Sequence, residues 1–333
     1  MEVLGYSITE KIYESANSII FRAIEQQKQR SVIIKVLNYE YPSEEKIAQF
    51  KYEYELIKHL NISGVITEYE LISYNSSYGI VFEDCGGKAL KEIDFYQWKL
   101  IEKLQLFIQI IDILSEIHQN NIIHKDINPS NIIVNEKTGV VKFIDFGNAT
   151  KLTEENTQAI SNDLIDGTIA YISPEQTGRM NRVVDYRSDY YSLGATFYEI
   201  LVQQGIFHDI VDPAELIYCH LAKEPVPLYI IDSNIPRIVS KIIMKFLAKN
   251  AEDRYQSVLG IKTDLQNCID QLQKADTIEE FPIGLKDNLN KFHVSQKIYG
   301  RKKELATLMS MYDLVCNGGS DHADIWSVRY WQE

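Results

Sequence analysis

Short runs of β-branched residues mark the first part of the chain. SIIFRA (18–23) and SVIIKVL (31–37) are separated by the polar turn EQQKQR, and YGIVFED (78–84) is a further run closed by two glycines. Runs of this kind, bounded by polar turns, predict β-strands. We therefore expect a strand-rich segment at the start of the chain.

One amphipathic helix is predicted inside this strand-rich segment, from about Ser43 to Leu60. It follows the start signal Pro42-Ser43-Glu44-Glu45, in which a polar cap precedes acidic residues. Its apolar residues recur at helical spacing. They are Ile47, Phe50, Tyr54 and Ile57.

The pattern changes after Gly87, where broad apolar stripes with helical spacing take over. The first runs from Leu100 to His118, and a hairpin follows in which NIIVN and VVKFIDF flank a turn at Gly139. From Asp189 onward helices dominate, and the segments that predict them are YYSLGATFYEILV, PAELIYCHLA, IPRIVSKIIMKFLAK and YQSVLGIKTDLQNCIDQLQ. We therefore expect an α+β fold of two lobes, with Glu83–Gly87 as the hinge.

Composition and charge narrow the classes of partner. Hydrophobic residues make up 45% of the 333 residues, and the net charge of −13 argues against nucleic acid or an anionic membrane as the main partner. The four cysteines show no CxxC spacing, so neither a zinc site nor a disulfide framework is indicated. No apolar run approaches membrane-spanning length, and the N-terminus lacks the basic-then-apolar pattern of a leader. We expect a cytoplasmic protein.

The segment HKDINPSN (124–131), with IDFG (144–147) across the predicted hairpin, carries the most specific chemistry in the chain. A carboxylate beside an acceptor hydroxyl can orient it and take its proton, and Asp126 fits that role. An amide oxygen and a second carboxylate can hold Mg²⁺, and Asn131 and Asp145 fit that role. A surface turn is the plain alternative, because Asp, Asn, Pro and Ser are ordinary turn formers. The Asp-Phe-Gly that follows favours phosphoryl transfer from a magnesium nucleotide.

Further landmarks follow in order along the chain. Lys35 lies in the strand run IIKVL, and Glu53 lies in the helical run FKYEYELIKHL. Glu55 is two positions away from Glu53 and would face elsewhere on that helix. Lys35 alone could be an ordinary strand-edge lysine, and Glu175, Asp189 and Arg254 alone could each be an exposed charge. The remaining landmarks are Gly167-Thr168, the run Tyr171-Ile172-Ser173-Pro174-Glu175, Asp189 and Arg254.

Together these residues resemble the protein kinase family over about residues 6 to 270. The resemblance implies the two-lobed kinase fold, with a strand-rich lobe over 1–85 and a helical lobe over 86–272. It implies a Ser/Thr protein kinase in signal transduction that uses ATP and Mg²⁺. The expected acceptor is a Ser or Thr hydroxyl of a protein, including this chain through autophosphorylation, and Thr168 matches the residue typical of Ser/Thr specificity.

The resemblance also assigns roles to single residues. Lys35 would bind the α- and β-phosphates, Glu53 would pair with Lys35, and Asp126 would be the catalytic base. The backbone of Glu83 and Cys85 would bind adenine. The residues placed in structural roles are Phe82 as gatekeeper behind the adenine, Asp189 as the brace of the catalytic loop, and Arg254 as the partner of Glu175.

The glycine-rich loop of the family has no glycine in this chain. With Ile20 aligned to the loop's valine, Tyr13, Ser15 and Ser18 take the three glycine positions. Glycine permits close backbone approach to phosphates. We therefore count these four residues as candidate nucleotide contacts, in which serine hydroxyls would replace backbone contacts.

Two basic positions near Asp126 have also changed. The usual lysine two residues after it is Asn128, a candidate catalytic position that has lost its charge. Loss of one transition-state contact typically costs about 3 kcal/mol. The usual arginine before it is Lys125, which weakens control by phosphorylation because lysine lacks the bidentate fork. The candidate phosphorylation sites are Thr150, Thr153, Thr157 and Ser161.

Three functions remain open on these residues. An active Ser/Thr protein kinase accounts for the complete set of catalytic side chains. A pseudokinase-like module, which would bind nucleotide and act through its conformation on a partner, accounts for the missing glycines and for Asn128. A small-molecule kinase is disfavoured by Thr168 and the Ser-Pro-Glu run, which resemble a platform for peptides.

Three stretches of the chain suggest a narrower resemblance, to the kinase domain of a larger protein. IYESANSIIFRA, HKDINPSN and SPEQTGRMNRVVDYRSDYYSLG resemble the kinase domain that precedes AAA-like ATPase, GAF and histidine kinase modules in bacterial hybrid signalling proteins. We expect a linker over 273–297 and the truncated start of an ATPase-like domain over 298–333.

The last residues do not continue the helix predicted to precede them. Because Trp has one codon, a one-base shift would encode Gly at 326 and 331 and would permit the phosphate-loop pattern G-x-x-x-x-G-K-S. We hypothesise that a frameshift produced this tail. A native tail with two tryptophans at that spacing is the alternative, and the nucleotide sequence decides between them.

Overall fold

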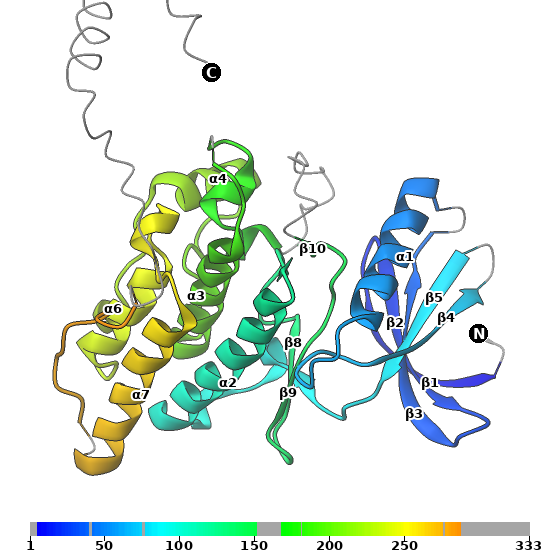
Figure 1. Ribbon diagram of the computed structural model, residues 1–333, viewed down its shortest axis with the longest axis horizontal. Helices are drawn as coiled ribbons and strands as arrows, with labels where there is room; N and C mark the ends of the chain where they lie inside the picture. Colours follow the sequence, from blue (N-terminus) through cyan, green and yellow to red (C-terminus); the bar gives the residue numbers. More distant parts are fainter. Residues whose placement is uncertain are drawn as a thin grey trace, which may run out of the picture. The chain divides into compact units, whose positions relative to one another are not determined.

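A five-stranded antiparallel sheet forms the first part of the structure (Figure 1). The computed structural model describes residues 5–39, 42–74, 77–151, 168–180, 182–275 and 277–287. The strands lie in the order β1-β2-β3-β5-β4, with bounds Tyr6–Glu14 (β1), Ser18–Glu25 (β2), Arg30–Leu37 (β3), Glu68–Tyr74 (β4) and Ser77–Glu83 (β5). The three strands predicted from the sequence are β2, β3 and β5. The two that were not predicted, β1 and β4, are the edges of the sheet.

The side chains of β3 alternate between two faces of the sheet, one packed into a hydrophobic cluster and the other carrying Lys35. Val32, Ile34 and Val36 are fully buried in one cluster on the sheet. Lys35 lies between them in sequence, so its side chain leaves from the opposite face. Its neighbours across the sheet are Ile20 on β2 and Ile80 on β5. The lysine therefore sits in the middle of the sheet, on a strand that is paired on both sides.

Helix α1 (Glu44–Lys58) packs against β4 and β5 and confirms the helix predicted there. The Ser43 hydroxyl accepts from the Lys46 amide at 3.3 Å and caps the helix. Two glutamates in the first turn are favourable near the positive end of the helix dipole. The buried face consists of Phe50, Glu53, Leu56 and Ile57.

Helices dominate the rest of the chain, which runs from green to orange in Figure 1. Their bounds are Leu100–Gln119 (α2), Tyr186–Val202 (α3), Pro213–Ala222 (α4), Leu228–Ile231 (α5), Arg237–Phe246 (α6) and Val258–Ala275 (α7). Helix α2 packs against α3 and α7, and α3 packs against α6. Phe107 of α2 and Phe197 of α3 stack with ring centroids 3.7 Å apart. The predicted α+β fold is confirmed, although α5 was not predicted and α6 ends earlier than expected.

Two small sheets are formed by strands between α2 and α3 in the sequence, joined by β6, which precedes α2. One has the order β6-β8-β9, with bounds Lys88–Ala89, Ile132–Asn135 and Val140–Phe143, and the other pairs β7 (Ile122–Ile123) with β10 (Thr150–Lys151). The β8–β9 turn is closed by the Asn135 side chain, which accepts from the amides of Lys137 and Thr138. Gly139 takes a φ of +73° in this turn. The hairpin predicted around Gly139 is confirmed.

Residues 277–287, part of the predicted linker, pack against the helical part. Ile278, Phe281 and Ile283 lie against its hydrophobic core, and Asp287 is 4% exposed. The predicted second domain over 298–333, including the tail for which we hypothesise a frameshift, lies outside the described residues. Among the described helices, none has the length and apolar character needed to cross a membrane.

Candidate active site

Lys35 on β3 bridges two carboxylates that come from different elements. Its Nζ lies 2.8 Å from each carboxylate oxygen of Glu53 on α1. The same Nζ lies 2.9 Å from Oδ1 of Asp145, in the loop after β9. Glu53 is 2% exposed, whereas Glu55 is exposed. The ion pair predicted between Lys35 and Glu53 is therefore confirmed, and Asp145 joins it.

Burial and charge act against each other in this cluster. Burial lowers the pKa of Lys35, but Asp145 and Glu53 together raise it above its ordinary value, so the ammonium stays charged. Burial would raise the pKa of Asp145, but Lys35 holds it below its ordinary value. Burial raises the pKa of Glu53, and Lys35 offsets this only in part. Asp145 is thus the carboxylate that is best kept ionised, as a cation ligand must be.

The β8–β9 hairpin brings the two candidate magnesium ligands together. Ile132 and Phe143, both fully buried, pair directly, and the Ile144 amide donates to the Asn131 carbonyl at 3.0 Å. Asn131 and Asp145 therefore flank the open end of the hairpin. Asp145 has a φ of +59°. A left-handed backbone costs about 1 kcal/mol or more in a residue other than glycine and is concentrated at functional sites.

Hydrogen bonds to amide side chains hold Asp126 in the loop before β8. Asn131 donates from Nδ2 to the Asp126 carbonyl at 2.9 Å, which turns its amide oxygen the other way. Asn128 donates from Nδ2 to Oδ1 of Asp126 at 2.9 Å. Asn148 donates from Nδ2 to Oδ2 at 3.4 Å. The changed residue Asn128 thus lies against the candidate base.

The backbone just before Asp126 is fixed from two sides. Asp189 of α3 is fully buried and accepts from the amides of His124, at 2.9 Å, and Lys125, at 2.8 Å. Gln176 donates to the Lys125 carbonyl at 2.8 Å. Lys125 itself has a φ of +64°, a strained conformation that these bonds hold in place. The bracing role predicted for Asp189 agrees with this geometry.

The turn that replaces the glycine-rich loop is closed by one of its own serines. The Ser15 hydroxyl accepts from the amides of Asn17, at 3.2 Å, and Ser18, at 3.0 Å. It donates to the Ser18 carbonyl at 3.2 Å. Tyr13 is 59% exposed and pairs with Ile20 across β1 and β2. Two amides of the candidate phosphate loop are thus already occupied by a side chain.

The predicted hinge follows β5. Oε1 of Glu83 lies 2.6 Å from Lys142 Nζ and accepts from the Thr67 amide at 2.9 Å. The Cys85 carbonyl accepts from Asn135 Nδ2 at 2.8 Å. The adenine contacts expected from the backbone of Glu83 and Cys85 stay a prediction. The predicted gatekeeper Phe82 is 6% exposed.

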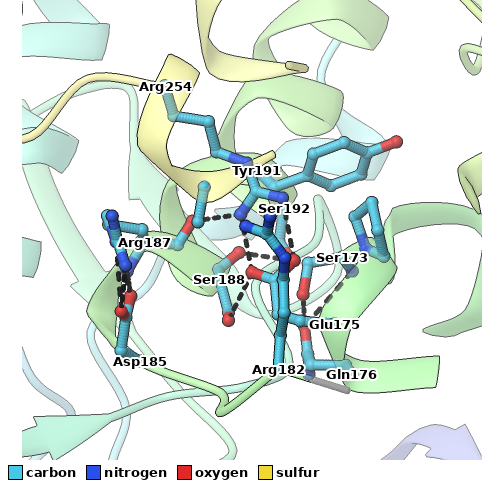
Figure 2. Close-up of polar contacts among 12 residues, drawn as sticks. Ser173, Glu175, Gln176, Arg182, Asp185, Arg187, Ser188, Tyr191, Ser192 and Arg254 are labelled. Carbon is cyan, nitrogen blue, oxygen red and sulfur yellow. Dashed lines mark hydrogen bonds and ion pairs between the residues drawn. The ribbon is translucent and has the colours of Figure 1, made fainter. Parts of the chain in front are cut away.

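A buried ion pair ties the end of the predicted activation segment to the helical part (Figure 2). Arg254 Nη1 lies 2.6 Å from Oε1 of Glu175, and Nη2 lies 2.8 Å from Oε2. Ser188 donates to the same Oε1 at 2.7 Å. Arg254 also donates to the carbonyls of Ala248, Lys249 and Arg187. The pairing predicted for Glu175 and Arg254 is confirmed.

Most of the predicted phosphorylation sites lie outside the described residues. Thr153, Thr157 and Ser161 fall in the segment 152–167. Thr150 lies on β10 opposite Ile123, and its hydroxyl is buried. Phosphorylation of Thr150 would first require its hydroxyl to become exposed.

Sequence reasoning missed several residues of the site. Asn148 looks like a turn former after Asp-Phe-Gly, and nothing in its spacing points to Asp126. Gln176 follows the Ser-Pro-Glu run without a signal of its own. Gln49, one helical turn before Glu53, donates to the Gly147 carbonyl at 2.9 Å. Only the position of Gln49 on the Glu53 face of α1 could have suggested its role.

The donor set at the hairpin fits a hard divalent cation. Asp145 keeps Oδ2 for a cation, because Lys35 takes Oδ1, and Asn131 keeps its amide oxygen. Oxygen ligands, few in number and supplemented by phosphate and water, are what Mg²⁺ uses in nucleotide sites. Among the described residues, no group of three or more His, Cys, Asp or Glu side chains is arranged to hold a metal. A phosphate-bound Mg²⁺ therefore fits better than a metal held by protein alone.

Comparison with known proteins covers most of the described chain. Residues 6–265 match a family model described as the protein kinase domain. A probable serine/threonine-protein kinase of Clostridium perfringens is 32% identical over 270 residues, which are 80% of this chain and 38% of that protein. Serine/threonine-protein kinase PknB of Mycobacterium tuberculosis is 28% identical over 267 residues, 78% of this chain and 42% of PknB.

A third relative is named as a hybrid histidine kinase rather than as a serine/threonine-protein kinase. Hybrid signal transduction histidine kinase G of Dictyostelium discoideum is 38% identical over 174 residues, which are 46% of this chain and 5% of that protein. This chain therefore spans less than half the length of each of these three relatives.

Proposed function

The chain belongs to the protein kinase family, and we propose that it transfers the γ-phosphate of ATP to a Ser or Thr hydroxyl of a protein. The observation that carries the proposal is the Lys35 bridge. Lys35 contacts Glu53 and Asp145 at once, so α1, β3 and the loop after β9 are assembled together. An assembled cluster of this kind is what phosphoryl transfer needs, because the protein contributes mainly positioning and charge.

Each residue has a distinct task in the proposed reaction. Lys35 holds the α- and β-phosphates, and Glu53 keeps Lys35 directed toward them. Asn131 and Asp145 would hold Mg²⁺, whose charge would offset that of the phosphates. Asp126 accepts the proton of the acceptor hydroxyl. As it does so, the hydroxyl oxygen forms a bond to the γ-phosphorus, and the bond from that phosphorus to the leaving ADP breaks.

A pseudokinase-like role is the second candidate, and the Ser15 turn favours it. Amides that could bind phosphate already receive a hydrogen bond from the Ser15 hydroxyl. Asn128 contributes no positive charge near the γ-phosphate. These features predict weak nucleotide affinity and slow turnover, but they leave the residues that perform the chemistry in place. We therefore place active transfer first.

The test is transfer of labelled γ-phosphate from Mg-ATP to a generic basic protein and to the chain itself. We expect labelled phosphoserine and phosphothreonine after hydrolysis, and their loss in Asp126→Ala and Asp145→Ala. Equal labelling in the wild type and both variants would overturn the proposal. Labelled phosphotyrosine alone would overturn the specificity.

We also propose that this kinase domain works in the cytoplasm within a larger signalling protein. The similarity to a hybrid signal transduction histidine kinase supports this organisation. The expected ATPase-like segment over 298–333 would be the start of the next module. Sequencing the gene beyond the codon for Glu333, in all three frames, would test it.

A further inference from the structure

The two carboxylate oxygens of Asp126 are held by two amide side chains from different loops. Asn128 donates to Oδ1 at 2.9 Å from within the loop that carries Asp126. Asn148 donates to Oδ2 at 3.4 Å from the far side of the β8–β9 hairpin, 22 residues later. A carboxylate oxygen accepts more than one hydrogen bond, so neither of these two contacts by itself excludes an acceptor hydroxyl.

Asn148 belongs to a turn that is anchored to the candidate magnesium loop. The Gly147 amide donates to Asp145 Oδ1 at 3.3 Å, and the Gly147 carbonyl accepts from Gln49 of α1 at 2.9 Å. The Ala149 amide closes the turn on the Phe146 carbonyl at 3.0 Å, and Ala149 is 2% exposed. The Asn148 backbone is therefore fixed relative to Asp145 on one side and to the core on the other.

From this arrangement we propose that Asn148 is a positioning residue for Asp126. Its amide fixes the second carboxylate oxygen, so that the base is aligned with the magnesium loop rather than with its own loop alone. This inference rests on the proposed function. Without Asn148, Oδ2 would lose the bond that ties it to the turn after Asp145, and the carboxylate would lose part of its alignment with the acceptor hydroxyl.

The contact predicts an effect on turnover that is separate from binding. The bond to the carboxylate is long, at 3.4 Å, so we assign it about 1 kcal/mol, below the range for short bonds to a charged group, which corresponds to a three- to tenfold change in rate. Lys35, Asn131 and Asp145 do not depend on Asn148 for the contacts described, so nucleotide binding should keep its affinity. The plain alternative is that Asn148 serves only the turn, in which case its loss would affect stability and leave turnover per folded molecule unchanged.

The experiment compares full-length variants in steady-state phosphoryl transfer to a generic basic protein. Asn148→Leu keeps the size of the side chain and removes the donor, and Asn148→His restores an N–H donor. We expect kcat to fall about three- to tenfold in Asn148→Leu with KM for ATP within twofold of wild type, and to recover in part in Asn148→His. Asn234→Leu is the matched control, because Asn234 also donates to an aspartate, Asp232, at 2.9 Å, on the exposed surface.

Two results would overturn the inference. One is a kcat for Asn148→Leu equal to those of the wild type and Asn234→Leu. The other is a loss in Asn148→Leu that Asn148→His does not relieve, or that comes with an equal rise in KM, because either pattern marks a structural role. Asp126→Ala, run in parallel, separates the two proposals: if it transfers phosphate as fast as wild type, the proposed function itself is wrong.

Discussion

Glu175 and Arg254, 79 residues apart in the chain, form a bidentate ion pair in which both side chains are almost completely buried. The pair joins the end of the predicted activation segment to the loop between α6 and α7. Both members also bond to other groups, Glu175 to Ser188 and Arg254 to three carbonyls. Buried pairs that are satisfied in this way are costly to break, because the remaining charge has no partner.

Replacing Glu175 by Gln should lower the free energy of unfolding by about 3 kcal/mol at neutral pH, because Arg254 stays buried without its counter-charge. Burial would raise the pKa of Glu175, but Arg254 lowers it below its ordinary value. The stabilisation is therefore present above that ordinary value and is lost as the pH falls through the folded-state pKa. Urea unfolding of both proteins from pH 7 to below pH 4.5 should show a difference that is constant above pH 4.5 and shrinks below it; a difference that stays constant there would contradict this account.

Removing the Ser15 hydroxyl should strengthen nucleotide binding. Ser15→Ala and Ser15→Gly both free the amides of Asn17 and Ser18 that the hydroxyl now occupies. Release of one such bond is worth about 1 kcal/mol, roughly a fivefold lower Kd for Mg-ADP. Calorimetric titration measures it, and Ser7→Ala is the control on β1. Weaker binding in both Ser15 variants would instead support the expectation that the hydroxyl contacts phosphate.

His220 should make the protein less stable in mild acid. Its side chain is fully buried, with Nδ1 3.1 Å from the Tyr191 hydroxyl. Burial and nearby Lys249 lower the pKa of His220 from 6.5 to about 3. Between those values the unfolded chain binds a proton that the folded chain does not, so stability falls as the pH drops below 6.5.

The contribution of His220 amounts to about 1.4 kcal/mol per pH unit, or about 2 kcal/mol at pH 5. Chemical unfolding of wild type and His220→Gln at pH 7.5 and pH 5 measures it. The variant should lose less stability than wild type over this range. Parallel losses in the two proteins would show that His220 is not the responsible group.

Gly260→Ala should loosen the segment 277–287. A Cβ at Gly260 would lie 2.5 to 2.7 Å from Asp287, including its Cα, so a side-chain rotation cannot relieve the clash. Asp287 would lose its bonds to the amides of Gln256 and Ser257. Alanine favours a helix by about 1 kcal/mol over glycine, but hydrogen bonds to a charged group are worth about 1.5 to 3 kcal/mol each.

We expect Gly260→Ala to lower the free energy of unfolding by about 2 kcal/mol or more, because the two lost bonds outweigh the gain in helix propensity. Limited proteolysis should cut the 277–287 segment faster than in wild type. Gly205→Ala is the control, because nothing lies within 4 Å of its added Cβ. Equal cleavage and stability in the three proteins would show that the close approach of Asp287 to α7 is not needed.

The sequence predicted the strands that are buried and missed those that are not. Strands β2, β3 and β5 are flanked on both sides in the sheet, and their β-branched runs reflect that burial. On β1 only Tyr6 is buried, and on β4 no residue from 68 to 73 is. An edge strand that faces solvent needs no alternating apolar pattern, so β1 and β4 left no signal.

The same distinction holds in the candidate site. Glu53 could be predicted through the family resemblance, and the structure supplies the physical reason: its carboxylate is buried on the same helical face as Phe50 and Ile57 and is paired with Lys35. The contact of Asn148 with Asp126 depends on the path of the hairpin between them. The direction of the Ser15 hydroxyl depends on the geometry of its turn. Neither feature can be predicted from the spacing of residues along the chain.

The most direct measurement of the central claim separates chemistry from binding at Asp126. Wild type and Asp126→Asn are compared in the affinity for Mg-ADP and in single-turnover transfer of γ-phosphate from bound ATP to a protein hydroxyl. The account predicts equal affinities and a rate lower by about a hundredfold or more in the variant, because a general base contributes that much. Equal rates in the two proteins, at equal occupancy by ATP, would contradict it.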